Sequence, residues 1–334
     1  MQPKLFKEQG TAEDFQKYLP VNVNTSFKTI APYLGLAELN YIQPLLGVEL
    51  FNSLVDKYIS NSITGEWEQL LDYVKYSQIN LAYYTGWSVL SVSVSDSGAS
   101  VKAKDNERLY RYQEEAILDT FKNNGFNIMD NVLDYLYANI ETFKKFENSI
   151  FYKAQQHTLI PTTAVFNTIY NINNSRLVFL KMKHYIKLVE DVELMHHFGR
   201  DFVTELLSAD GTDEKYSFII ENIRCYIVYL SLVKGIGELK KLPTEKGLIF
   251  ENIADRSARD GFTKSPVPVA EVETTMQFCK ATASGYLSTT IDYLKKHKED
   301  FPKFTAWAGE SESNPTIFIP NNDRKPVFFF PAHI

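Results

Sequence analysis

Apolar residues recur every three or four positions along most of the chain, which is the spacing of helices that bury one face. This pattern predicts helices over 36–43, 48–59 and 66–90, and a further long helix over 215–239. The two long helices are apolar on most sides, which is typical of helices at the centre of a bundle. We expect the helix over 36–43 to end before Pro44, because a residue that precedes proline disfavours the α conformation. The sequence therefore predicts a mainly α protein.

The helical pattern of the first half returns, diverged, in the second half. Glu38 and Gly47 align with Glu190 and Gly199 at an offset of 152 residues (190 − 38). Two further blocks align at offsets of 149 (235 − 86) and 158 (301 − 143), so only short length changes separate them. The aligned pairs include Tyr33 with Tyr185, Gly86 with Gly235, Phe143 with Phe301 and Phe146 with Phe304. Solenoid repeats are about 20–50 residues long, so each copy here is expected to be a whole domain.

This duplication predicts two tandem, diverged helical-bundle domains with additional segments around them. We expect an N-terminal arm (1–26), a first domain (27–150), a linker (151–178), a second domain (179–308) and a C-terminal tail (309–334).

After the first long helix the hydrophobic period shortens from about three and a half residues to two. Val92 and Val94 alternate with serines before Asp96 and Gly98, which predicts a strand, a turn and a second strand. The second copy carries Glu245, Lys246 and Gly247 at the matching place. Each domain is therefore expected to bear a protruding β-hairpin or loop.

The C-terminal tail, TIFIPNNDRKPVFFFPAHI, is expected to form a short β-hairpin about its Asn-Asn-Asp turn. Its phenylalanines are Phe318, Phe328, Phe329 and Phe330. Large exposed apolar patches are uncommon on monomers, so these side chains either pack on their own domain or dock on a partner. Together with the two hairpins, they form the candidate assembly surface.

Composition and charge narrow the class of protein. The net charge of −6 over 334 residues disfavours a general nucleic-acid coat, which needs a basic field. Cys225 and Cys279 are too few and too far apart for a disulfide framework, so a reducing compartment is expected. The first twenty residues lack the apolar centre of a signal peptide, and we expect neither a membrane span nor a membrane partner.

Candidate catalytic chemistry is sparse. His196 and His197, with Glu193 four residues before the second histidine, could gather metal ligands on one helical face. The HExxH spacing is absent, however, and the equivalent positions of the first copy are Pro44 and Leu45, which cannot bind metal. A metal-dependent helical enzyme that uses His196 and His197 therefore stands as an alternative from another class. Our main expectation is a protein without catalytic residues, metal or cofactor.

One stretch of the first copy resembles a known family. The motif consists of Pro44, Leu45, Leu46, Gly47, Glu49, Leu50, Phe51, Asn52 and Leu54. An aromatic-rich helix follows it and leads to the turn at Asp96 and Gly98. This stretch is similar to the head–tail connector (adaptor) proteins of tailed phages, in the divergent form found in phages and prophages of Bacteroidetes. The resemblance covers residues 27–100 and reaches 179–250 only through the repeat. The second copy differs from this motif, with His196 in place of Pro44 and Thr204 in place of Asn52.

The resemblance implies a structural ring subunit of the virion, assembled in the cytoplasm of the bacterial host. Such proteins are small helical bundles with a protruding loop or hairpin, and about a dozen copies close into a ring between portal and tail. The implied partners are further copies of the chain, the phage portal protein and downstream tail or neck proteins. DNA would only pass through the lumen of the ring. Another phage neck or tail-completion protein is the nearest alternative. The turn residues Pro44, Gly47 and Gly199 would then serve structure.

Overall fold

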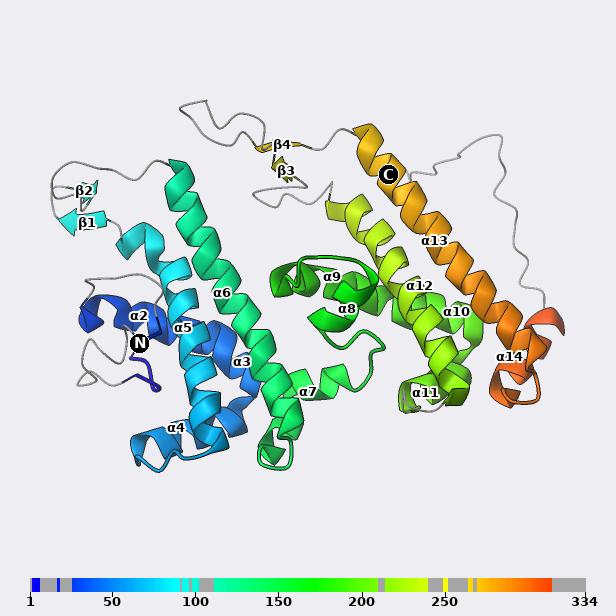
Figure 1. The fold of residues 1–334 in the computed structure, drawn as a ribbon, viewed down its shortest axis with the longest axis horizontal. Coiled ribbons are helices and arrows are strands. Elements are labelled where there is room, and N and C mark those ends of the chain that lie inside the picture. The colour runs from blue at the N-terminus through cyan, green and yellow to red at the C-terminus, as the bar shows by residue number, and fades with distance from the viewer. Residues whose placement is uncertain are drawn as a thin grey trace, which may run out of the picture.

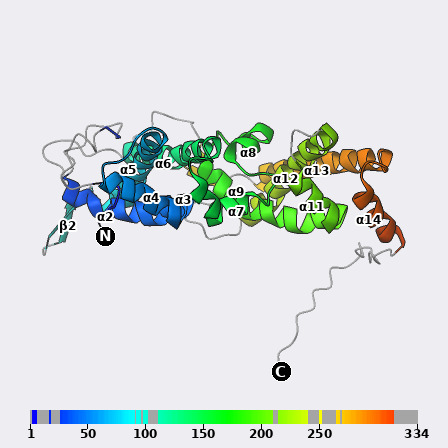
Figure 2. The same cartoon turned by 90° about the horizontal axis from the view of Figure 1, so that it is seen from below.

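The computed structural model contains two helical domains that lie in one row along its long axis, and Figures 1 and 2 show this row from two sides. In each domain one long helix packs along another, α5 along α6 and α12 along α13, while shorter helices cover them. The structure describes residues 2–6, 17–18, 26–90, 92–95, 98–101, 111–209, 214–239, 249–251, 264–266 and 269–313.

The first domain has the following elements in chain order. They are α2 (Phe27–Ala37), the π-helix η1 (Glu38–Ile42), α3 (Gln43–Leu46), α4 (Val48–Ile59), α5 (Glu66–Leu90), β1 (Val92–Ser95), β2 (Gly98–Val101), α6 (Arg111–Ala138), the 3₁₀-helix η2 (Lys144–Asn148) and α7 (Ile150–Gln155).

The second domain repeats this order with small differences. Its elements are α8 (Thr163–Ile169), α9 (Arg176–Leu188), the π-helix η3 (Val189–Leu194), α10 (Met195–Phe198), α11 (Arg200–Ser208), α12 (Glu214–Leu239), β3 (Ile249–Glu251), β4 (Lys264–Pro266), α13 (Val269–Lys296) and α14 (Pro302–Ser313). The protein is thus mainly helical, with two domains in tandem.

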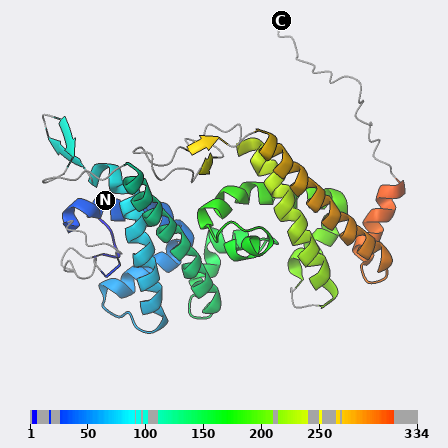
Figure 3. The same cartoon turned by 45° about the horizontal axis from the view of Figure 1, so that its top comes forward.

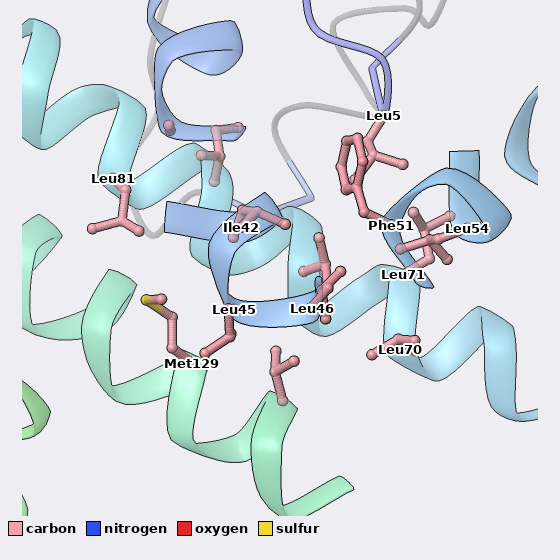
Figure 4. Close-up of a cluster of buried hydrophobic side chains, with 14 of the residues drawn as sticks. Leu5, Ile42, Leu45, Leu46, Phe51, Leu54, Leu70, Leu71, Leu81 and Met129 are labelled. Atoms are coloured by element: carbon pink, nitrogen blue, oxygen red, sulfur yellow. The ribbon is translucent and has the colours of Figure 1, made fainter. Parts of the chain in front are cut away.

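Each domain has its own hydrophobic core. In the first core, Ile42, Leu45 and Leu46 from η1 and α3 pack between α5 and α6, as Figure 4 shows. In the second core, Leu194 and Phe198 occupy the matching positions of η3 and α10. Burial of such side chains contributes about 1.5–3 kcal/mol each, so either cluster can stabilise a domain.

The first helical segment does not end before Pro44, so that prediction is wrong. The chain stays helical through η1 and α3 and turns only after Leu46. Proline normally clashes with the carbonyl four residues earlier, but the wider π-helical turn before it changes that spacing. The second copy has the same π-helix before His196, so the π-helix belongs to the fold and the proline is accommodated by it.

Segments expected outside the domains contribute to the cores. Leu5 and Tyr18 of the expected arm are buried in the first core. Ile160 and Phe166, which belong to the expected linker 151–178, are buried in the second core. The residues of this expected linker also form most of α7 and all of α8. The expected tail begins inside α14, which runs to Ser313.

The described strands form two short antiparallel pairs. β1 pairs with β2, with Val92 opposite Val101, and Figure 3 shows this pair beyond the end of α5. β3 pairs with β4, with Ile249 opposite Pro266. The expected turn residues 245–247 precede β3 along the chain, so they do not lie between its two paired strands.

By length and composition, residues 214–236 of α12 could cross a membrane, and this is the one such helix among the described residues. Half of the segment is buried in the protein, including Ile219, Ile223 and Ile227 of the second core. These contacts are those of the central helix of a bundle.

Candidate functional site

A glycine turn occurs at the same place in both domains. Gly47 ends α3 and Gly199 ends α10, with φ of 78° and 76° and ψ of 155° in both cases. The N–H of Gly47 donates to the carbonyl of Gln43 at 3.0 Å, and that of Gly199 donates to the carbonyl of Met195 at 3.1 Å. Residues with a Cβ rarely adopt this backbone conformation, so the two glycines have a structural reason to be kept.

Different side chains cover the two glycine turns. A Cβ built on Gly47 would lie 2.6 Å from the Cβ of Ser149, whereas one built on Gly199 would lie 2.4 Å from Cδ1 of Trp307. Ser149 and Trp307 align at the offset of 158 residues that the sequence gives for this block (307 − 149). The duplication therefore holds for spatial neighbours, although the covering residue has changed from a small side chain to a large ring.

Beside Gly47 the first domain has an apolar groove of about 390 Å³. Val48 and Ile150, which line it, are 59% and 88% exposed. We call this the Gly47 groove. It is lined by Gln43, Pro44, Gly47, Val48, Glu49, Lys145, Asn148, Ser149 and Ile150.

A buried glutamate holds a short peptide segment in the first domain. Glu38 lies in η1, and its Oε2 accepts the backbone N–H groups of Lys4 and Leu5 at 2.9 and 3.4 Å. Gln78 of α5 donates to the same oxygen at 3.2 Å. Burial raises the pKa of Glu38 above its ordinary value, although these hydrogen bonds oppose the rise. We call residues 2–6 the first strap.

The second domain has the same arrangement. Oε1 of Glu190, in η3, accepts the backbone N–H of Leu159 and the hydroxyl of Thr158, both at 2.8 Å. Burial raises the pKa of Glu190 to about 7, against the effect of both hydrogen bonds. Arg224 donates to the carbonyl of Leu159 at 2.9 Å. We call residues 157–160 the second strap.

The sequence comparison between the two halves did not find the straps. Leu5 lies 33 residues before its glutamate and Leu159 lies 31 residues before its own, so an alignment without gaps misses them. The sequence signal that could have found the straps is an apolar pair in each of them, Leu5 with Phe6 and Leu159 with Ile160. Both pairs are buried in the structure. The second copy of the fold therefore begins before residue 179.

The two domains meet at a buried ion pair. Arg176, at the start of α9, pairs with Asp130 of α6, and its guanidinium also lies 5.7 Å from the ring centre of Phe151. A cavity of about 260 Å³ adjoins this pair. Its lining includes four buried atoms without a hydrogen-bond partner in the described part of the chain: Tyr137 Oη, Gln155 Oε1, Thr163 Oγ1 and Arg176 Nε. Polar atoms of this kind are normally satisfied by ordered water.

His197 is part of the packing of the second domain, whereas His196 is exposed. His197 lies edge-on to Tyr226, with ring centres 6.1 Å apart, and burial lowers its pKa. Glu193, which the spacing offered as a further ligand, pairs with Lys234 at 2.8 Å instead. Within the described residues, no three His, Cys, Asp or Glu side chains gather in a way that could hold a metal ion.

The candidate assembly residues are only partly described. Val92 and Val94 lie on β1 and Gly98 on β2, while Pro44, Gly47 and Gly199 lie at the two glycine turns. Asp96, Glu245, Lys246, Gly247, Phe318, Phe328, Phe329 and Phe330 lie outside the described residues.

Comparison with known families adds one result. The profile of a family of unknown function, DUF6712, matches residues 42–156 and again residues 180–311. The chain belongs to this family. The two matches fall on the two domains, so the chain of this DUF6712 protein carries two copies of the family's unit. Comparisons with curated proteins and with solved structures found no match.

Proposed function

We propose that this DUF6712 protein is a structural ring subunit at the head–tail interface of a phage, in which two connector-like domains are fused. The observation that carries the proposal is the duplication of a whole bundle with its glycine turn, its π-helix and its buried glutamate. Its partners would be further copies of the chain, the portal protein, and a tail or neck protein. DNA would pass through the lumen of the ring.

The use of charged residues inside the bundles agrees with a structural role. The buried carboxylates Glu38 and Glu190 accept hydrogen bonds from strap backbone, and the buried Arg176 joins the two domains. Fusion doubles the lateral surface that each subunit offers to its neighbours. It also allows one domain to face the portal and the other to face the tail.

The hairpin of β1 and β2 would act as an arm in this assembly. Among the described residues each of its strands pairs only with the other, and an unpaired strand edge can accept a strand of a partner. Val92, Val94, Asp96 and Gly98 belong to this arm, and the loop around Glu245, Lys246 and Gly247 is its proposed counterpart.

Binding to the portal protein encoded by the same phage or prophage tests the proposal. We expect the two purified proteins to sediment together, and we expect replacement of residues 92–101 by a Gly-Ser linker to weaken this binding at least tenfold. Absence of binding by the intact chain, at concentrations where both proteins stay folded, would contradict the portal contact. Binding to a purified tail protein alone would favour the tail-completion alternative.

A further inference from the structure

We propose that the Gly47 groove is the docking site for the C-terminal phenylalanine segment, Phe328 to Phe330, of a second copy of this chain. The inference rests on the proposed ring, because a tail can reach a neighbour's groove only where copies assemble. It adds the contact that would join one subunit to the next.

The second domain indicates what kind of group the groove accepts. There, the ring of Trp307 lies directly against the turn at Gly199. The first domain has the same turn at Gly47, with φ and ψ within a few degrees, but Ser149 stands at the position of Trp307. One copy of the fold thus carries its own aromatic ring at this turn, and the other copy lacks one. Because Ser149 itself covers the Gly47 turn, an aromatic side chain from elsewhere would lie beside Ser149 in the groove.

The lining of the groove has the right chemistry for such a ring. Val48 and Ile150 expose most of their surface on its rim, and Pro44 lines it next to the turn. An aromatic ring in the groove would remove apolar surface from water on both partners, which is the main favourable term in protein association. Asn148 donates a 2.9 Å hydrogen bond to Glu49, so both side chains would keep a hydrogen-bond partner if a ring excluded water from the groove.

The chain itself supplies a suitable aromatic segment. After Ser313 it has 21 further residues (334 − 313), which include Phe318 and the run from Phe328 to Phe330. Twenty-one extended residues reach at most about 70 Å, which is enough to pass from one subunit to another. The tail starts from α14, at the end of the second domain that is remote from α3 and α7 (Figure 1).

The geometry of this contact agrees with a ring. The groove belongs to the first domain and the tail follows the second, so each copy would offer two different surfaces. Contacts between unlike surfaces build rings when the rotation between copies closes, and filaments when it does not.

Disulfide trapping between two variant chains tests the proposal. Both chains carry Cys225→Ser and Cys279→Ala, which remove the native thiols. One chain adds Val48→Cys in the groove and the other adds Phe329→Cys in the tail. After mixing and mild oxidation, we expect a disulfide-linked pair of chains. The matched control replaces Val48→Cys by Arg200→Cys, the exposed counterpart at the Gly199 turn (200 − 48 = 152), and we expect at least tenfold less of the linked pair.

A third variant separates docking from chance collision. Ile150 is 88% exposed, so Ile150→Glu leaves the fold intact while placing a charge on the rim. Added to the Val48→Cys chain, this change should lower the yield of the linked pair at least fivefold, with an unchanged circular dichroism spectrum. An unchanged yield would overturn docking in the groove.

The remaining outcomes separate this inference from the proposed function. In a further variant that carries both Val48→Cys and Phe329→Cys on one chain, a disulfide within that chain and no disulfide between chains would overturn docking on a second copy. A ring by mass without any linked pair would overturn the inference and leave the proposed function standing. A monomer by mass without any linked pair would overturn both.

Discussion

The backbone N–H of Leu159 donates a 2.8 Å hydrogen bond to Oε1 of Glu190, a buried carboxylate 31 residues further along the chain. The first domain contains the same relationship between Leu5 and Glu38. In each case the strap carries a buried apolar pair, and a buried carboxylate of the π-helix accepts hydrogen bonds from the strap. The straps tie the residues before each bundle to its centre, so they are part of the domains.

The stability of the second domain should depend on pH through Glu190. Its folded pKa of about 7 lies above the ordinary value of 4.5, so the folded state binds the proton more tightly. The resulting stabilisation is complete below pH 4.5 and is lost as pH rises to about 7. We expect the free energy of unfolding to fall by up to about 3 kcal/mol across this range through this group.

The variant Glu190→Gln should remove most of that pH dependence, because the amide keeps an acceptor oxygen and does not ionise. Urea unfolding at pH 5 and at pH 8 measures the effect, and Asp201→Asn, an exposed carboxylate of the same domain, is the matched control. Equal pH dependence in Glu190→Gln and in the native chain would contradict this role of Glu190.

Loss of the strap side chains should destabilise the domain that each strap covers. Leu5 and Leu159 are 0% and 5% exposed, so Leu5→Ala and Leu159→Ala should each cost about 2–5 kcal/mol. Chemical unfolding followed by hydrogen exchange would assign each loss to its own domain. The exposed Gln2→Ala should change the free energy of unfolding by less than about 0.5 kcal/mol. Straps that merely lie on the surface would give values near that of Gln2→Ala.

The glycine turns should tolerate no side chain. In Gly47→Ala and Gly199→Ala, a positive φ and a close neighbour both oppose the new methyl group. Gly65 isolates the first effect, because its φ is +61° and nothing lies within 4 Å of an added Cβ. We expect Gly65→Ala to cost about 1–2 kcal/mol and the other two variants to cost distinctly more. Thermal unfolding would decide, and equal losses at all three sites would refute the close packing.

The buried ion pair between the domains should be costly to break from one side. Arg176→Ala leaves Asp130 without its partner in a site that is 22% exposed, which should cost about 3–5 kcal/mol. The exposed pair of Lys187 and Asp191 is the control, and Lys187→Ala should cost less than about 1 kcal/mol. Denaturant titrations of both variants measure the difference. A loss for Arg176→Ala no larger than that for Lys187→Ala would mean that the pair does not hold the domains together.

The sequence predicted the helical class and the duplication because both depend on local periodicity and on matched residues. The three aligned blocks reappear as matched contacts: Trp67 lies edge-on to Phe143, and Tyr216 lies edge-on to Phe301, at ring-centre distances of 5.1 and 5.7 Å. An added Cβ on Gly86 would lie 2.6 Å from Tyr33, which explains why this glycine has a counterpart in Gly235.

The features that the sequence did not predict depend on long-range contacts or on unusual backbone. The straps meet their glutamates more than 30 residues away, at unequal separations in the two copies. The helix continues through Pro44 because a π-helix precedes it. The residues Glu38 to Ile42 have no local preference that predicts a π-helix. The ring of Trp307 covers the turn at Gly199 from a distant part of the chain, so no local pattern predicts this contact.

The mass of the purified protein in solution, alone and then mixed with its portal protein, tests the central claim most directly. The proposed function predicts a closed assembly of many copies in at least one of the two samples, with a single sharp mass. A monomer in both samples, at micromolar concentration and physiological salt, would contradict the ring and would leave only the duplicated DUF6712 fold.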